Sequence, residues 1–260
     1  MNSQRTVLNR RSVIGLTAAG CLELAYQQMA VASALRPSVA EQKKLGDVAA
    51  NQVLTKYSLV KGERAQRFAR VGSKLVAALP EKDRKAWDYS FQVVESKEIN
   101  AFALPGGHMF LFSGLMEKMT SDSQIAAVTG HEMTHVRKEH WAKAVEQQRE
   151  RLLGIGLLLN LFKIGSTGRQ IAGGVEGVIS LQYSRKEEDE ADAKGLINMV
   201  DAKFDPEGMI QLFDLLQKAA GSGDGLPEFL RDHPLTKDRI KKTRERIDKL
   251  NAPPPPPVEG

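Results

Sequence analysis

The chain contains 260 residues, of which 42% are hydrophobic and 27% are charged. These proportions are typical of a globular protein and exclude a polytopic membrane protein and a wholly disordered chain, while the length suits one well-buried domain with short terminal segments. The formal net charge is +5, but Lys and Arg are interleaved with Asp and Glu. Because no nucleic-acid-binding motif or aromatic platform accompanies the charge, we expect no nucleic acid partner and a mild affinity for anionic membrane surfaces.

The amino terminus has the features of an export signal. Three arginines precede a run of small and apolar residues at 12–20, which is typical of targeting segments but too short to span a bilayer. The end of this run, Ala18-Ala19-Gly20-Cys21, is similar to a lipobox with Cys21 as the lipidated residue. Residues 9–14 are also similar to a twin-arginine signal, and ordinary cleavage after Ala34 is a third alternative. We expect residues 1–34 to be an export or lipoprotein signal region, unless they form a first helix that stays attached.

The next segments predict helices and a small sheet. Two amphipathic helices are predicted between residues 37 and 79, because apolar residues recur there at steps of three and four. Aromatic and branched residues near period two predict strands at 87–94 and 108–112. A capping pair, Ser121-Asp122, predicts a long helix from about residue 123 to 149.

The second half of the chain is mostly helical in pattern. Residues 152–164 are apolar almost throughout, yet shorter than the roughly 20 residues that a spanning helix needs, which leaves a buried helix or a membrane-touching lid. Further helices are predicted at about 178–200, 206–220 and 237–250, and the proline-rich tail at 251–260 is not expected to pack. Together the elements predict an α+β fold that is mostly α.

The sequence His131-Glu132-Met133-Thr134-His135 is the clearest chemical motif in the chain. His131 and His135 are four residues apart, so on an α-helix they share one face and their imidazoles can converge on one metal ion. Glu132 is directed at the water on that ion, as a general base rather than a ligand. Cys21 is the only cysteine, so the other ligands must be His or carboxylates. The alternative is a chance pair of core histidines.

Two regions offer a third ligand. On a continuous helix, His140 is rotated by about 140° from His135, so we expect it on the helix surface or behind a ligand. The acidic segment at 183–192 places Glu188 and Asp192 on one helix face, where one carboxylate can bind the metal while the other accepts the far N–H of a ligand histidine. The alternative is a solvated charged face.

Four short motifs occur in order along the chain. They are Asn100 to Gly107 before a strand, Gly130 to Val136, Ser184-Arg185 with Glu188 and Asp192, and His233-Pro234 with Arg239-Ile240. In this combination they resemble the zinc metallopeptidase family that includes the CAAX prenyl protease, HtpX, BepA and LoiP.

The resemblance implies both a domain and a set of site residues. The domain is a gluzincin-like zinc peptidase over residues 35–250, with a small β-sheet beside the active-site helix and one Zn²⁺ per chain. The implied zinc ligands are His131, His135 and Glu188, with Glu132 as the catalytic base. Asp192 is then the carboxylate that supports a ligand histidine.

Other residues are expected near the substrate. Asn100 and the strand that carries His108 and Phe110 are expected to hold an extended peptide by main-chain pairing, the alternative being ordinary sheet packing. By the family resemblance, His233 lies at the open side of the metal, where it either donates to an oxyanion or binds as a fourth ligand that keeps the enzyme latent. Arg239 braces that loop or assists with charge. The alternative for His233 is a residue at the start of a helix.

The favoured function is a zinc metalloendopeptidase that cleaves unfolded or misassembled envelope proteins, which the resemblance implies for soluble or lipid-anchored bacterial members of the family. The expected partners are polypeptide substrates and a membrane surface or lipid anchor, and the expected location is the periplasm of the bacterial cell envelope. The alternative function is a periplasmic assembly chaperone with little or latent proteolysis.

Overall fold

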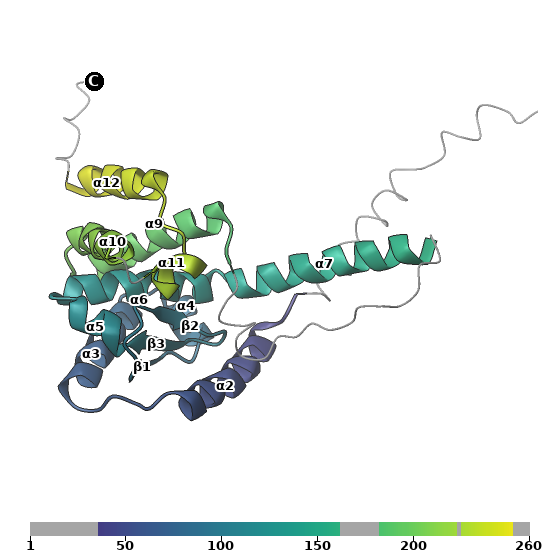
Figure 1. The fold of residues 1–260 in the computed structure, drawn as a ribbon, viewed down its shortest axis with the longest axis horizontal. Helices are drawn as coiled ribbons and strands as arrows, with labels where there is room; N and C mark the ends of the chain where they lie inside the picture. The colour runs from purple at the N-terminus through teal and green to yellow at the C-terminus, as the bar shows by residue number, and fades with distance from the viewer. Residues whose placement is uncertain (1–35, 162–181, 223–224, 252–260) are drawn as a thin grey trace, which may run out of the picture. The chain divides into compact units, whose positions relative to one another are not determined.

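The computed structural model describes residues 36–161, 182–222 and 225–251. The chain divides into two units. The larger comprises Ser38–Ala144 and Ser166–Gly260, and the smaller comprises Met1–Pro37 and Val145–Gly165. The expected signal region at 1–34 and the proline-rich tail from residue 252 lie outside the described residues. Figure 1 draws these two segments in grey.

A three-stranded sheet lies in the described part of the larger unit. Its strands are β1 (Ser90–Val94), β2 (Ala101–Ala103) and β3 (His108–Phe112). β1 pairs parallel with β3, and β2 pairs antiparallel with β3, so β3 is the central strand and β2 lies at an edge. The predictions of β1 and β3 are confirmed. β2 was not predicted, because three residues are too few for a period of two to be recognised.

Between residue 36 and the sheet, the structure has three helices, namely α2 (Val39–Lys56), α3 (Glu63–Ala77) and α4 (Glu81–Ala86). α2 begins at a capping box formed by Ser38 and Glu41, an arrangement that satisfies backbone donors at a helix start. Gly46 of α2 packs on the turn between β2 and β3, where a Cβ would lie 1.6 Å from the carbonyl oxygen of Pro105. Only glycine permits this approach, which fixes α2 against the sheet.

The helix with the HExxH sequence, α6 (Asp122–Arg137), packs against α9 (Arg185–Asp201). Both start at a capping serine, Ser121 for α6 and Ser184 for α9. Their backbones meet at two glycines, since a Cβ on Gly195 would lie 2.9 Å from the carbonyl carbon of Gly130. This close crossing brings the turn that begins at His131 beside the first turns of α9.

The prediction of one helix from residue 123 to 149 is wrong. α6 ends at Arg137, Lys138 caps it, and α7 (His140–Leu161) begins after Glu139, whose φ is +52°. A left-handed residue interrupts the ladder of helical hydrogen bonds, so α6 and α7 are separate helices. The apolar run at 152–164 extends beyond the end of α7 into undescribed residues. Among the residues that the structure describes, no helix combines the length and apolar character needed to cross a bilayer.

The remaining described helices are α5 (Ser113–Lys118), α10 (Glu207–Ala220), α11 (Glu228–Asp232) and α12 (Lys237–Asn251). α10 and α12 confirm two predicted helices. The helix expected from residue 178 begins at Arg185 instead, and residues up to 181 lie outside the described part. The main core lies between the sheet, α3, α6 and α10 (Figure 1). The fold is therefore mostly helical with a small sheet, as expected.

Candidate metal centre

Four buried side chains meet where α6 crosses α9. They are His131 and His135 of α6, Glu188 of α9, and His233, which follows α11. One ligand atom from each lies within 4.8 Å of the others, so the group can hold a metal ion. Nε2 of His131 is 3.1 Å from Nε2 of His135 and 3.3 Å from Nδ1 of His233. The three ligands implied by the sequence therefore come together, and His233 joins them.

The donor set fits a cation for electrostatic reasons. Where two ring nitrogens face each other, at most one hydrogen can lie between them. The remaining nitrogen lone pairs are buried without a partner, which is costly, and a cation bound between them would remove that cost. Burial is the largest cause that holds the pKa of His135 well below its usual value, and the charge of the neighbouring His131 is the second. The ring of His135 is therefore neutral and can ligate a metal. Burial also disfavours the charged form of His233, but the carboxylates of Glu132 and Glu188 outweigh it and raise its pKa to about 9.

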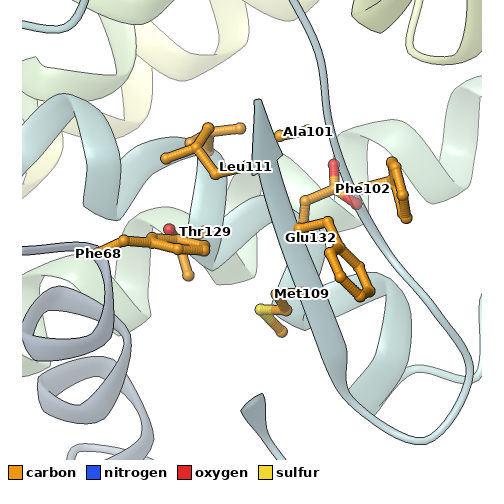
Figure 2. A pocket seen from close by; sticks show the side chains of 9 residues that line it. Phe68, Ala101, Phe102, Met109, Leu111, Thr129 and Glu132 are labelled. Carbon is orange, nitrogen blue, oxygen red and sulfur yellow. The ribbon is translucent and has the colours of Figure 1, made fainter. Parts of the chain in front are cut away.

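Glu132 lies beside this group rather than within it. One carboxylate oxygen, Oε2, accepts a hydrogen bond of 3.0 Å from the backbone N–H of Ala103 in β2, and Oε1 lies 3.5 Å from Nε2 of His233. Figure 2 shows Glu132 at the wall of a small pocket between β2, β3 and α6, among mostly apolar side chains that include Phe102 and Met109. This burial raises the pKa of Glu132, against the opposing charge of His233. A raised pKa suits a group that must take up a proton.

Asp192 and Arg239 lie behind the group of four side chains. Oδ1 of Asp192 is 3.0 Å from Nδ1 of His131, a contact that would support His131 as a ligand. Arg239 donates from Nε and Nη2 to the two carboxylate oxygens of Asp192 at 2.7 Å, and its Nη1 lies 2.6 Å from Oε2 of Glu188. Burial opposes ionisation of Asp192, but Arg239 outweighs it and lowers the pKa. Arg239 also donates to the carbonyl of Pro234, so it braces the loop rather than facing the ligand nitrogens.

The expectation that His108 and Phe110 bind substrate through main-chain pairing of their strand is wrong for β3. Both sides of β3 are already paired, so the edge strands of this sheet are β1 and β2. The ring of His108 is bound between Ser90 and Asp47, at 2.8 Å from each, and Phe110 is buried against Phe102. These residues fix the sheet and α2 instead.

Asn100, at the start of β2, is buried and its side-chain oxygen accepts from the N–H of Ala101. This bond occupies a main-chain donor of the edge strand. The position of Asn100 is therefore known, and its role as a substrate contact stays a prediction.

Sequence reasoning missed Tyr183, and of its two alternatives for His140, the helix surface or a place behind a ligand, the structure agrees with the second. The ring of Tyr183 stacks on His135, with ring centres 4.1 Å apart. The ring of His140 is buried, and its Nδ1 lies 2.9 Å from Nδ1 of His135. The only signal for Tyr183 was its place next to the acidic helix. The choice for His140 stayed open because the helix was assumed to continue.

Comparison with known proteins places this geometry in a family. Residues 63–247 match the model of Peptidase family M48. A putative beta-barrel assembly-enhancing protease of Vibrio cholerae is 30% identical, with 84% of this chain and 51% of that protein covered. The mitochondrial metalloendopeptidase OMA1 of Arabidopsis thaliana is 31% identical over 68% of this chain and 35% of its own length. The metalloprotease LoiP of Escherichia coli is 26% identical over 81% of this chain and 82% of its own length.

The chain spans about half the length of the beta-barrel assembly-enhancing proteases that it matches. The family match, by contrast, covers most of the chain and includes every residue of the metal-ligating group. The chain therefore belongs to Peptidase family M48, a family of metallopeptidases.

Proposed function

We propose that the chain is a zinc-dependent endopeptidase of the gluzincin kind, in which His131, His135 and Glu188 hold one zinc ion and Glu132 is the catalytic base. The observation that carries the proposal is the buried convergence of the ligand atoms with a carboxylate of raised pKa beside them. Three protein ligands with one further position are typical of a catalytic rather than a structural zinc site.

The spacing of the ligand atoms supports zinc. Bonds of 2.0–2.1 Å in a tetrahedral site separate neighbouring ligand atoms by about 3.3 Å. The corresponding separations are 3.1 Å between His131 and His135, 3.3 Å between His131 and His233, and 3.5 Å between Nε2 of His135 and Oε1 of Glu188. Neutral imidazoles with a carboxylate are a donor set that zinc prefers when no cysteine is present.

The residues around the site divide the work of hydrolysis. Zinc would polarise the scissile carbonyl and lower the pKa of the attacking water to about 7. Glu132 accepts the proton of that water and passes it to the leaving amine. The backbone N–H of Ala103 orients Glu132 through its hydrogen bond. The outer edge of β2 lies close to Glu132, and an extended substrate would pair there by donating its main-chain N–H groups to carbonyls of β2, because the N–H groups of Ala101 and Ala103 are already bound. Asn100 remains a candidate contact there.

Metal removal tests the proposal. We expect the purified protein to carry one zinc ion per chain and to digest casein, and we expect a chelator to abolish digestion until zinc is restored, because the ion supplies the electrophile. Metal analysis and a casein assay on the same sample measure both. Digestion that persists in metal-free protein would contradict a metallopeptidase, and zinc binding without digestion would favour the assembly chaperone with latent proteolysis.

His233 has two possible roles, which predict opposite results. We propose that it is a fourth ligand that releases its proton when the metal binds, because its Nδ1 lies 3.3 Å from Nε2 of His131 and 2.9 Å from Oε1 of Glu188. Because the ring must leave the fourth position before the catalytic water can bind, the parent is expected to be active but partly latent. His233→Ala is therefore expected to raise turnover of a fluorogenic peptide while zinc content is retained. If His233 is instead a donor to the oxyanion, the same variant should lose about two orders of magnitude in turnover. Equal turnover of variant and parent over several pH values would remove His233 from the site.

We propose unfolded or misassembled envelope proteins as substrates and the bacterial envelope as the location. The support is the name of several relatives, beta-barrel assembly-enhancing protease, together with the signal-like pattern at residues 1–34. Within that proposal, Cys21 carries the lipid, with twin-arginine export of a soluble form as the alternative. Cells fed labelled fatty acid should attach the label to the parent protein and not to the Cys21→Ser variant. Equal labelling of both would end the lipoprotein proposal and leave simple export standing.

A further inference from the structure

Each histidine of the HExxH motif uses its second ring nitrogen as well as its first. Nε2 of His131 and Nε2 of His135 face each other in the ligand group. On the far side, Nδ1 of His131 meets the carboxylate of Asp192 at 3.0 Å, and Nδ1 of His135 meets Nδ1 of His140 at 2.9 Å. His135 and His140 are 3% and 0% exposed, so no water competes for this contact.

The break between α6 and α7 is what brings His140 to this position. On an unbroken helix, a residue five places after His135 lies about 140° around the axis. Glu139 adopts a left-handed backbone with φ of +52°, a conformation that costs a non-glycine residue on the order of 1 kcal/mol or more. The helix therefore breaks at this residue at some cost, and the ring of His140 lies behind His135.

The two facing Nδ1 atoms can share only one hydrogen. If Nε2 of His135 ligates the metal, the hydrogen of its ring is on Nδ1 and is donated to His140. Nδ1 of His140 is then the acceptor, and the hydrogen of that ring is on Nε2. Nε2 of His140 lies 3.5 Å from Oε2 of Glu190 on α9, which is the group that this N–H faces.

We propose that His140 is a positioning residue for the metal ligand His135, and that Glu190 selects the ring tautomer of His140 that can accept the hydrogen of His135. The inference rests on the proposed metal-binding function and extends it. In this arrangement the carboxylate of Asp192 supports His131, and the neutral imidazole of His140 supports His135. Loss of such a supporting contact commonly lowers metal affinity by about 10- to 100-fold.

A matched pair of substitutions separates this role from packing. Asn and Leu are similar in size and shape, but Asn carries an oxygen near the place of the histidine Nδ1 and Leu carries no acceptor. We expect His140→Leu to lower zinc affinity by about 10- to 100-fold, and His140→Asn to restore most of it. Zinc affinity is measured by competition with a chromogenic chelator, in the full chain with Glu132→Gln in every sample to prevent self-digestion.

The proposal would be overturned if the Leu variant bound zinc as tightly as the parent. It would also be overturned if the Leu and Asn variants lost the same affinity, because the two side chains differ mainly in the hydrogen-bond acceptor of Asn. Should the Leu variant not fold, the nitrogen chemical shifts of isotope-labelled histidines in the zinc-bound parent decide the matter. A hydrogen on Nε2 of His140 supports the proposal, and a hydrogen on its Nδ1 overturns it. A parent protein that binds no zinc would overturn the proposed function itself, which is a different result from equal binding by parent and variants.

Discussion

Peptide cleavage should fall by about 100- to 10,000-fold in Glu132→Gln, the range that a general base contributes, while zinc content stays at the parent level. The amide has nearly the size of the carboxylate but cannot accept the proton of the attacking water. Its carbonyl oxygen can still accept the N–H of Ala103, which donates to Glu132 in the parent. The fold around β2 is therefore expected to persist.

The measurement is kcat/KM on a fluorogenic peptide, with metal analysis of the same preparation. Glu245→Gln is a matched control, because this glutamate is more than half exposed and pairs only loosely with Lys241. The control should leave both quantities unchanged. Turnover of Glu132→Gln at the parent rate would rule out Glu132 as the base, and loss of zinc in that variant would show that Glu132 helps to hold the metal.

A second large effect concerns stability, and its source is Arg239. Replacement of this residue by Met is expected to lower the free energy of unfolding by about 3–5 kcal/mol at pH 7, the usual cost of leaving a buried charge without its partner. Arg239 is 5% exposed and pairs with Asp192 and Glu188. Urea denaturation of chelator-treated protein measures the difference without a contribution from bound metal.

The loss in Arg239→Met should shrink as the pH is lowered. In the parent, Arg239 outweighs burial and holds the pKa of Asp192 below its usual value of 3.8, so this stabilisation is present at neutral pH and is lost only as the pH falls through the lowered value. Without Arg239, burial raises the pKa of Asp192. The folded variant then binds a proton more readily than the unfolded chain, and its stability rises as the pH falls from 7 towards 4.

The control for Arg239 is Arg244→Met, which removes a surface pair. Arg244 lies 2.6 Å from Glu207, but its side chain is 44% exposed, and such pairs contribute about 1 kcal/mol or less. Similar losses in the two variants would indicate that Arg239 acts as an ordinary surface charge. A loss in Arg239→Met that is the same at pH 7 and pH 4.5 would show that Asp192 is not its main partner.

Much of the site follows from local sequence. The i, i+4 spacing of His131 and His135 and the same spacing of Glu188 and Asp192 fix shared helix faces, because helical geometry repeats every 3.6 residues. Which of the two carboxylates faces the metal does not follow from spacing. That assignment came from the family resemblance, and in the structure Glu188 lies with the histidines while Asp192 lies behind His131.

Other parts depend on tertiary structure and were beyond such reasoning. No Gly or Pro marks the break at Lys138 and Glu139, so the apolar period suggested one helix, and the choice between the helix surface and a place behind a ligand stayed open for His140. Residues 101–103 form a strand only because β3 lies beside them. His233 is 102 residues from His131 in the chain, and nothing local to either residue specifies that their rings meet.

The contact between Gly130 and Gly195 bears on which cation the protein can select. A Cβ at residue 195 would lie 2.9 Å from the backbone of α6, closer than the 3.4 Å at which ordinary contacts begin. Any larger residue there would force the two helices apart by a few tenths of an ångström. Metal–ligand distances tolerate only about 0.2 Å, and ions that differ in size by that amount compete for the same donors. In the proposed zinc site, Gly130 and Gly195 would therefore limit how far the histidines of α6 can lie from Glu188 of α9, although neither glycine binds the ion.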